Sequence, residues 1–347
     1  MFTPASSRAR PGFPARSCAA SAATRTTAPT SLPAPTIRAS SGRPCWPTSS
    51  GAWRSSRATT TPSESGADVM LLGLNTATLG LDDVFQAIAW IRGSGFEAIE
   101  LSCDPGPNER GKVSAPQADE NLIRHLREAC SGFQLVSLHG PWMSFPGFSL
   151  LSADESLRSK SIEEVKACID LAARLGSPQV IYHSGNPGRD ATDEQALALA
   201  RLSFAELDEH GGRRGVKLGL EVVDFFQPAE RFEGFEAMPL SNTGITLDVG
   251  HISFPNPLHP GKPSYHPYDR IGAFIERFAP RLLSLHIHDY DGKHDHQPLG
   301  TGRIDFEDIL GSLREIRYNG LLCFEFSTSV KRADILRSRE LLLKKMR

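Results

Sequence analysis

The sequence predicts an α/β protein, a (β/α)8 TIM barrel preceded by a disordered N-terminal extension. From Met70 onward, short apolar runs alternate with amphipathic segments, which is the pattern of repeated strand–helix units around a parallel sheet. Eight such units can be counted. The segment from Met70 to Arg347 is also close to the length of about 250 residues that is typical of this barrel.

The first 68 residues differ in composition from the rest of the chain. They are rich in Ser, Ala, Thr, Pro and Arg, and they lack a hydrophobic period that could bury one face of a helix or strand. This composition also occurs in transit peptides, but the repeated Pro and the lack of an amphipathic helix favour an extension upstream of a start at Met70. We therefore expect residues 1–68 to be disordered and assign residues 69–347 to the barrel.

Eight apolar runs are the expected barrel strands, and most of them follow a Gly or Pro turn. They are residues 70–75, 97–101, 133–138, 178–183, 216–221, 243–248, 282–287 and 320–325. Between them, apolar residues recur at the spacing of one buried helix face. The clearest of these stripes are Leu81, Val84, Phe85, Ile88 and Ile91; Ile162, Val165, Ile169 and Ala172; and Phe306, Ile309, Leu310 and Leu313.

Composition and charge exclude several classes of partner. No apolar run approaches the 18 or so residues of a membrane span, so we expect no membrane association. The chain has a net charge of -2, although residues 1–68 hold eight arginines against two acidic residues, so the barrel itself is acidic. We therefore expect no nucleic-acid partner. The six cysteines form no Cys-x-x-Cys pair, which favours a reducing, cytoplasmic compartment over a disulfide framework.

Polar residues close almost every predicted strand. In this fold the chemistry lies at the C-terminal ends of the strands, so these residues share one rim. A single His at a strand end is usually a structural residue, but the repetition around the barrel indicates a common site. The candidates are His139, His183, Glu221, Asp248, His251, His286 and Glu325, with His294, Asp295 and His296 in the loop after residues 282–287.

The mixture of carboxylates and imidazoles indicates a metal site. Such a set suits zinc, manganese, iron or cobalt, whereas an oxygen-only set would favour calcium or magnesium. Glu221, Asp248, His286 and Glu325 would provide four ligands and leave room for water or substrate oxygens. We expect His288 to point away from His286 and either to support the metal ligands from behind or to be structural. Surface positions are expected for the remaining histidines, His125, His210, His259 and His266.

These residues resemble those of the xylose isomerase-like barrels, a superfamily that contains sugar isomerases and epimerases, inosose dehydratases and the endonuclease IV proteins. The resemblance covers about residues 70 to 345. It rests on residues 247–251 (Leu-Asp-Val-Gly-His), on residues 285–302 and on the closing Phe324-Glu325. Similarity to the ketose 3-epimerases implies that Glu221, Asp248, His286 and Glu325 hold one divalent metal ion, either manganese, zinc, cobalt or magnesium.

The resemblance implies an isomerase or epimerase acting on a sugar, a sugar phosphate or a polyol. The difficult step is removal of a proton from the carbon next to a carbonyl group. A metal ion that stabilises the resulting enediolate lowers the barrier to this step. Glu221 and Glu325 would carry the proton. The histidines expected to contact substrate are His139, His183, His251 and His296. A homo-oligomer is compatible with this interpretation.

Two alternatives remain open: an abasic-site endonuclease, and a barrel that binds without turnover. Similarity to endonuclease IV implies a three-zinc cluster, with His139, His183, His251 and His296 as additional ligands. Where that family has an Asp two residues before the last His, this chain has His294. Residues 74–78 also lack the Ser-His opening of endonuclease IV. These departures and the acidic barrel favour sugar chemistry, including that of an inosose dehydratase-like lyase.

Overall fold

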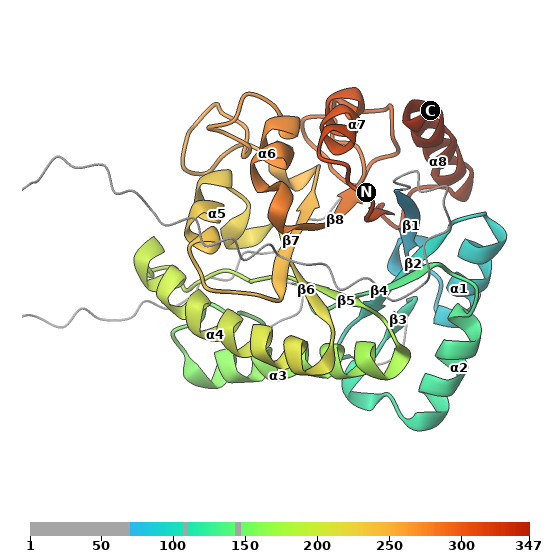
Figure 1. The fold of residues 1–347 in the computed structure, drawn as a ribbon, viewed down its shortest axis with the longest axis horizontal. Helices are drawn as coiled ribbons and strands as arrows, with labels where there is room; N and C mark the ends of the chain where they lie inside the picture. The colour runs from blue at the N-terminus through green and yellow to red at the C-terminus, as the bar shows by residue number, and fades with distance from the viewer. Residues whose placement is uncertain (1–69, 107–109, 143–146) are drawn as a thin grey trace, which may run out of the picture. The chain divides into compact units, whose positions relative to one another are not determined.

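A computed structural model of the chain describes residues 70–347 except 107–109 and 143–146. These residues form a barrel of parallel strands surrounded by helices (Figure 1). The expectation of disorder for residues 1–68 falls outside the part of the chain that is described. Within the described ranges, no helix is long and apolar enough to cross a membrane.

Eight parallel strands close the barrel. Each pairs with its neighbour along the chain, and β1 pairs with both β2 and β9, so the sheet has no open edge. The predicted strands are confirmed to within two residues at either end. They are β1 (Leu71–Asn75), β2 (Ala98–Cys103), β4 (Leu135–His139), β5 (Gln179–Tyr182), β6 (Lys217–Glu221), β7 (Thr243–Asp248), β8 (Leu282–Ile287) and β9 (Leu321–Phe324). The sequence did not indicate β3 (Lys112–Val113), a two-residue strand paired with the end of β2.

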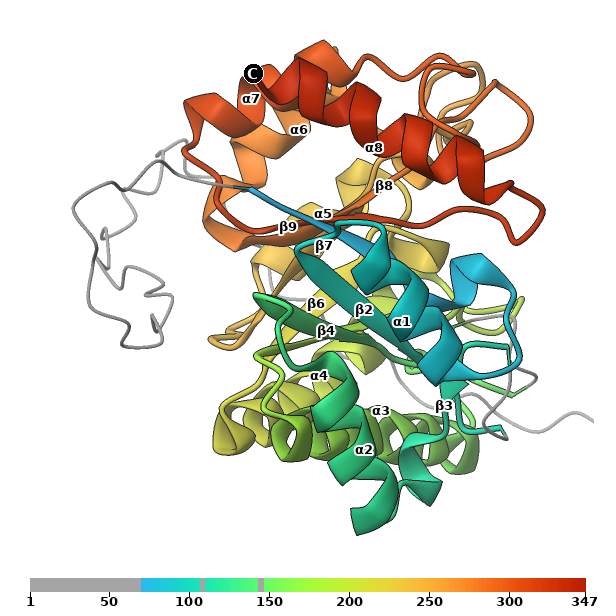
Figure 2. The same cartoon turned by 90° about the vertical axis from the view of Figure 1, so that its right-hand side faces the viewer.

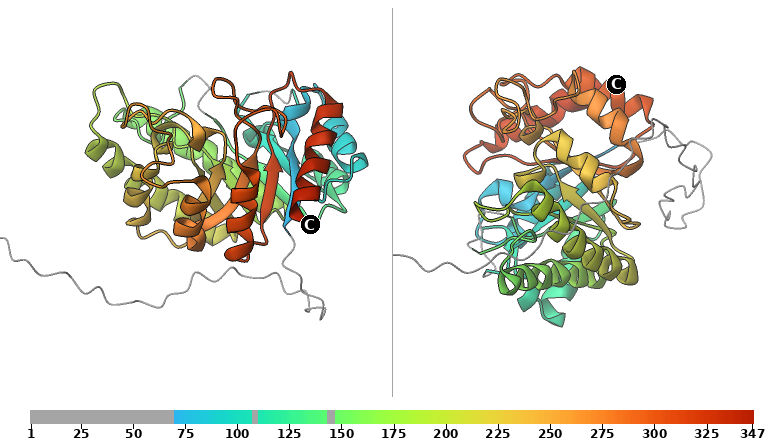
Figure 3. Two further views of the ribbon diagram at one scale, coloured as in Figure 1. Left: turned by 90° about the horizontal axis from the view of Figure 1, so that it is seen from above. Right: turned by 90° about the vertical axis from the view of Figure 1, so that its left-hand side faces the viewer.

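The helices pack around the outside of the strands, as Figures 2 and 3 show from other directions. Several begin at a side chain that accepts a hydrogen bond from the first turn, such as Asp119 before α2 and Thr192 before α4. In the described residues they are α1 (Val84–Gly93), α2 (Glu120–Cys130), α3 (Glu155–Leu175), α4 (Asp193–Arg214), α5 (Ala229–Glu236), α6 (Ile271–Phe278), α7 (Phe306–Glu315) and α8 (Arg332–Met346).

Alternation along the strands separates two environments. In β2, Ile99 and Leu101 belong to the main apolar core between strands and helices, whereas Glu100 and Ser102 are buried polar residues of the other face. At the amino ends of the strands the barrel interior is apolar, because Ala98 packs there against residues at the start of β9. Toward the carboxyl ends of the strands the interior becomes polar and then charged. Alternation therefore delivers the functional side chains into the barrel at that end.

Gly244 on β7 lies where the strands approach too closely for a side chain. A Cβ atom there would come 2.4 Å from the carbonyl oxygen of Arg281, which is backbone and cannot rotate away. The strand pairing beside it is irregular, with a register shift between Ile245 and Thr246. The barrel wall at this point therefore requires glycine.

We expect Gly244→Ala to lower the free energy of unfolding by about 1–3 kcal/mol, because an overpacked site must shift its backbone. Gly212 on α4 is the matched control, since a Cβ atom there meets nothing within 4 Å. Gly212→Ala should instead stabilise the protein by about 0.5–1 kcal/mol through the higher helix propensity of alanine. Urea unfolding of both variants measures the difference. Equal stabilities would show that β7 and β8 are not constrained in this way.

Candidate functional site

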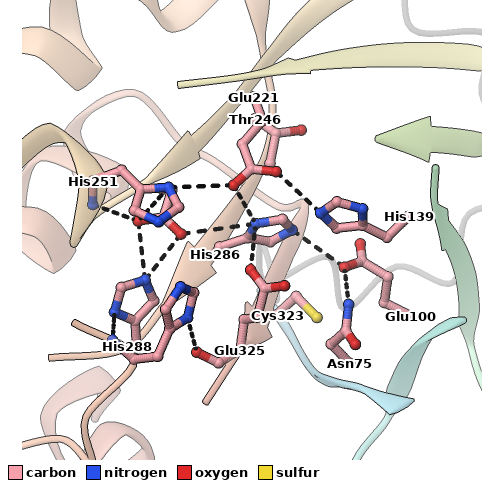
Figure 4. A network of polar contacts seen from close by, with 12 residues as sticks. Asn75, Glu100, His139, Glu221, Thr246, His251, His286, His288, Cys323 and Glu325 are labelled. Atoms are coloured by element: carbon pink, nitrogen blue, oxygen red, sulfur yellow. Dashed lines mark hydrogen bonds and ion pairs between the residues drawn. The ribbon is translucent and has the colours of Figure 1, made fainter. Parts of the chain in front are cut away.

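Acidic and imidazole side chains from most of the barrel strands converge at the carboxyl end of the barrel (Figure 4). Most of these side chains occupy interior-facing positions at or near a strand end. The group comprises Glu100 in the middle of β2, His139 of β4, Glu221 of β6, Asp248 of β7, His286 of β8 and Glu325 just after β9. The structure thus brings together the four residues predicted to bind metal.

Glu221 lies at the centre of this group and is only 1% exposed. Its Oε2 atom is 3.1 Å from His139 Nε2 and 2.9 Å from His183 Nε2. Its Oε1 atom is 3.3 Å from His286 Nδ1 and 3.6 Å from His251 Nδ1. Burial alone would raise the pKa of Glu221, but the surrounding histidines hold that pKa well below its usual range. One buried carboxylate therefore faces four imidazoles.

Around His286, three carboxylates approach the same ring nitrogen. Nδ1 lies 3.1 Å from Glu325 Oε2, 3.3 Å from Glu221 Oε1 and 3.9 Å from Asp248 Oδ2. Donor atoms of four residues, His139, Glu221, His286 and Glu325, all lie within 4.8 Å of one another. Asp248 forms a second group with Glu221 and His251. The two groups share Glu221.

Glu100 is a buried member of the site that sequence reasoning missed. Its Oε1 atom is 3.2 Å from His286 Nε2 and accepts a hydrogen bond from Asn75, and its Oε2 atom accepts one from Ser137. Since Glu100 can only accept when ionised, His286 Nε2 must carry a proton. In the neutral ring this leaves Nδ1 unprotonated, with its lone pair facing Glu221 and Glu325. Glu100 stands in the middle of β2, so a search of strand ends passed over it.

His139 and His183 are also held by their outer nitrogens. His139 Nδ1 is 2.9 Å from the carbonyl oxygen of Gly140, to which it can only donate. His183 Nδ1 faces Asp224 Oδ2 at 3.5 Å, and no described residue donates a hydrogen bond to either Asp224 oxygen. The neutral His139 ring then presents its Nε2 lone pair to Glu221 Oε2, and the nearby Asp224 carboxylate favours the same tautomer for His183. Acceptors facing one another require positive charge between them, from protons or from a metal ion.

Protons fulfil this requirement in the metal-free protein. Burial alone would lower the pKa of His183, but the combined effect of Glu221 and Asp224 is larger and raises that pKa to about 10. In the same way, burial raises the pKa of Glu325, while His286 lowers it to about 2. The carboxylates are therefore ionised at neutral pH, which is the form that binds a cation.

A third group lies nearer to solvent, in the loop after β8. Asp295 Oδ2 is 3.2 Å from His251 Nε2 and 3.5 Å from His296 Nε2. His294 instead points to the surface, where it pairs with Asp291 at 3.2 Å. Asp295 therefore supplies the carboxylate beside His251 and His296. The resemblance to endonuclease IV instead aligns His294 with the position of that carboxylate.

The expected orientation of His288, pointing away from His286, was wrong. Its Nε2 atom lies 2.9 Å and 3.0 Å from the two oxygens of Asp248, and its Nδ1 accepts a hydrogen bond from the backbone N–H of His296. Residues two positions apart on a strand face the same side, so His288 follows His286 into the interior. There it orients Asp248, which also accepts from the backbone N–H of His251.

The converging side chains form the floor of a cavity of about 780 Å³. All four histidines predicted to contact substrate line it, together with Glu221 and Glu325. Trp142 and Phe326 form an apolar part of the cavity wall. Its volume is within the range of pockets that enclose small molecules. The cationic residues at this cavity are Arg110, Lys112 and Lys293.

Comparison with known proteins assigns the chain to a family. The sequence profile of the xylose isomerase-like TIM barrel matches residues 88–345. The chain belongs to this family. A ketose 3-epimerase of Arthrobacter globiformis is 25% identical over 273 residues, which cover 76% of this chain and 84% of the relative. An uncharacterised protein of Methanocaldococcus jannaschii is 26% identical over 291 residues, covering 79% and 88%.

Solved structures of the same fold include sugar epimerases. A D-tagatose 3-epimerase-like protein superimposes with a TM-score of 0.65 at 21% identity, over 80% of this chain and 97% of that protein. An L-ribulose 3-epimerase gives a TM-score of 0.61 at 20% identity, over 78% and 86%. At these identities the superpositions show the common barrel fold.

We expect Glu100→Gln to move the titration midpoint of His286 in the metal-free protein to lower pH. Burial lowers the pKa of His286, but Glu221, Glu325 and Glu100 together raise it well above its usual value. Loss of the Glu100 charge removes part of that effect. NMR of the imidazole nitrogens measures the midpoint, and Ser137→Ala is the control that removes a hydrogen bond to Glu100 without removing charge. An unchanged midpoint in Glu100→Gln would contradict the coupling.

Proposed function

We propose that the protein is a divalent-metal-dependent epimerase or isomerase of a sugar or sugar phosphate. The observation that carries this proposal is the placement of Glu221 and Glu325, both within 3.3 Å of His286 Nδ1, at the floor of a cavity sized for a small molecule. The similarity to a ketose 3-epimerase supports it.

The residues present fit a metal ion. Glu221, Asp248, His286 and Glu325 would hold it, because they offer ionised carboxylates and an imidazole nitrogen whose tautomer Glu100 sets. When bound, the ion would polarise the oxygens of the substrate and stabilise negative charge as a proton leaves. A mixed nitrogen and oxygen set suits manganese, zinc or cobalt, and magnesium is the fourth candidate.

Proton transfer would be the work of two carboxylates on different strands. Glu221 and Glu325 approach His286 from two sides (Figure 4), so one could take a proton from a substrate carbon while the other, having first gained a proton from solvent, gives its own proton to the opposite face. Delivery of a proton to the opposite face inverts that carbon, which is an epimerisation, and the first carboxylate then releases its proton to solvent. Glu325 has a side-chain exposure of 17% against 1% for Glu221, so it is the more accessible to substrate.

The histidines of the cavity would hold the substrate in this position. His139, His183, His251 and His296 line the space that a sugar would occupy, and imidazoles hydrogen-bond well to hydroxyl groups. Asp224 faces the outer nitrogen of His183 and would fix the orientation of that ring. Trp142 and Phe326 would exclude water from the same space.

A direct test is proton exchange at the reacting carbon. A panel of ketoses and ketose phosphates, each supplied with manganese, zinc, cobalt or magnesium, should contain a substrate that is epimerised or isomerised in D₂O with uptake of deuterium. Glu325→Gln should lower kcat on that substrate by about two to four powers of ten, since the amide cannot carry the proton.

Glu164→Gln is the control for this variant, because Glu164 is a largely buried glutamate on α3 that does not line the cavity. It should retain wild-type kcat. Near wild-type turnover by Glu325→Gln would refute the role of Glu325 and the two-carboxylate mechanism.

A second candidate is an abasic-site endonuclease with a multinuclear zinc site. The observation in its favour is that His139 and His183 share one oxygen of Glu221, while His251, Asp295 and His296 form a separate donor group. These groups could hold ions beyond the first. On the sugar proposal the same histidines bind substrate.

Bound zinc separates the two proposals. The double variant His139→Ala, His183→Ala and the single variant Asp295→Asn should each retain the zinc content of the wild type if these residues bind substrate. A loss of one or two ions per chain, measured by elemental analysis, together with cleavage of an abasic duplex by the wild type, would replace the sugar proposal with the endonuclease.

A further inference from the structure

We propose that the protein has a separate structural metal site on its surface, formed by Glu230, His259 and His266 and suited to zinc. Glu230 lies at the start of α5, and the two histidines lie in the loop that leads into α6. One donor atom from each lies within 4.8 Å of the others. His259 Nε2 is 3.0 Å from Glu230 Oε1, and the two imidazole rings are 4.8 Å apart. None of the three residues lines the cavity described above.

The loop carries its histidines on a backbone that is already ordered. The N–H of Ser264 donates to the carbonyl of Phe254, and that of Asn256 to the carbonyl of Lys262, so residues 254–264 form a short hairpin. His259 lies in its turn, where its carbonyl accepts from the N–H of Lys262. The positions of the ligands therefore do not depend on the ion.

The second arm of the hairpin is hydrogen-bonded to the start of α5, the helix that supplies the third ligand. Ser264 accepts a hydrogen bond at its carbonyl from the N–H of Ala229, and its hydroxyl accepts one from the side chain of Gln227. Ala229 precedes Glu230 directly. Two residues beyond Ser264, the chain reaches His266. The loop and the start of α5 thus hold the three donor residues beside one another.

The carboxylate is oriented by a buried amide. Asn256 is 3% exposed, and its Nδ2 atom donates to both oxygens of Glu230, at 3.2 Å and 3.4 Å. The N–H of Leu258 donates to Asn256 Oδ1, which fixes the amide in turn. An outer partner of this kind is what holds a metal-binding carboxylate in place.

The donor set indicates the class of ion. Two imidazoles and one carboxylate, with a water molecule as fourth ligand, suit zinc, whereas calcium and magnesium prefer oxygen ligands. An ion pair between His259 and Glu230 alone would not explain why His266 lies beside them. Among the described residues, the His266 ring nitrogens make no hydrogen bond or ion pair, and its ring faces His259.

Occupancy of this site would connect the hairpin tip to α5. The same loop begins at His251, which lines the cavity, and Phe254 at the base of the hairpin packs 5.6 Å from the His251 ring. An ion that binds the folded protein and not the unfolded chain stabilises the folded state by its binding free energy. The ion would therefore stabilise the wall of the cavity without taking part in its chemistry.

The test is the zinc content of the whole protein after removal of metal, equilibration with zinc and removal of the excess. His266→Ala and Glu230→Gln should each bind about one ion fewer per chain than the wild type. His210→Ala is the matched control, because His210 also pairs with a carboxylate outside the cavity, that of Asp170 at 2.8 Å, and among the described residues it belongs to no group of three possible metal ligands. The control should bind as much zinc as the wild type.

Thermal unfolding in the presence of a chelator shows whether the variants fold, and their Tm should then equal that of the wild type. With zinc added, the wild-type Tm should rise more than that of His266→Ala. Equal zinc content in the wild type and His266→Ala would overturn the proposal, and so would an equal loss in His210→Ala. Either result is independent of the sugar proposal, since all three substitutions lie outside the cavity.

Discussion

The site depends on the compensation of a single buried charge, that of Glu221. A carboxylate removed from water is costly unless hydrogen bonds and opposite charge surround it, and Glu221 at the end of β6 is almost fully buried. Its partners are four imidazoles from different parts of the barrel rim. Only a closed barrel brings residues so distant in sequence to one carboxylate, so the closure of the sheet between β1 and β9 is a condition for the site.

The imidazoles are themselves held from outside. Glu100 lies behind His286, the carbonyl of Gly140 behind His139, and Asp224 behind His183. Each outer group takes one ring nitrogen and turns the other toward Glu221. The interior therefore contains more acceptors than donors, and either protons or a metal ion must balance them. Because a ligand must lose its proton to bind metal, metal binding and proton release are linked at this site.

Much of this could be predicted because it follows from local pattern. Apolar runs of strand length gave the eight strands, and the rule that chemistry lies at their carboxyl ends gave the residues that converge. What could not be predicted depends on tertiary contact: Glu100 joins the candidate site only through its contact with His286 of β8, and nothing in its own segment indicates this. The position of Asp295 beside His251 and His296 depends on the conformation of the loop after β8, which the sequence pattern does not specify. His288 lies two residues after His286 and therefore faces the same side, as strand alternation requires.

The choice between a sugar and a nucleic acid is decided by the surroundings of the charged floor more than by the floor itself. Carboxylates and imidazoles in this arrangement can hold one ion or several, and both proposals use them. Trp142 and Phe326 line the cavity with apolar surface. Of the three cationic residues that line it in the described part of the chain, Lys112 is already paired to Asp104 at 2.8 Å and lies over the Trp142 ring. A duplex backbone requires many phosphate contacts, whereas a small polar ligand with one end on the floor and one side against an aromatic ring requires few. The distribution of charge around the floor therefore favours the small ligand.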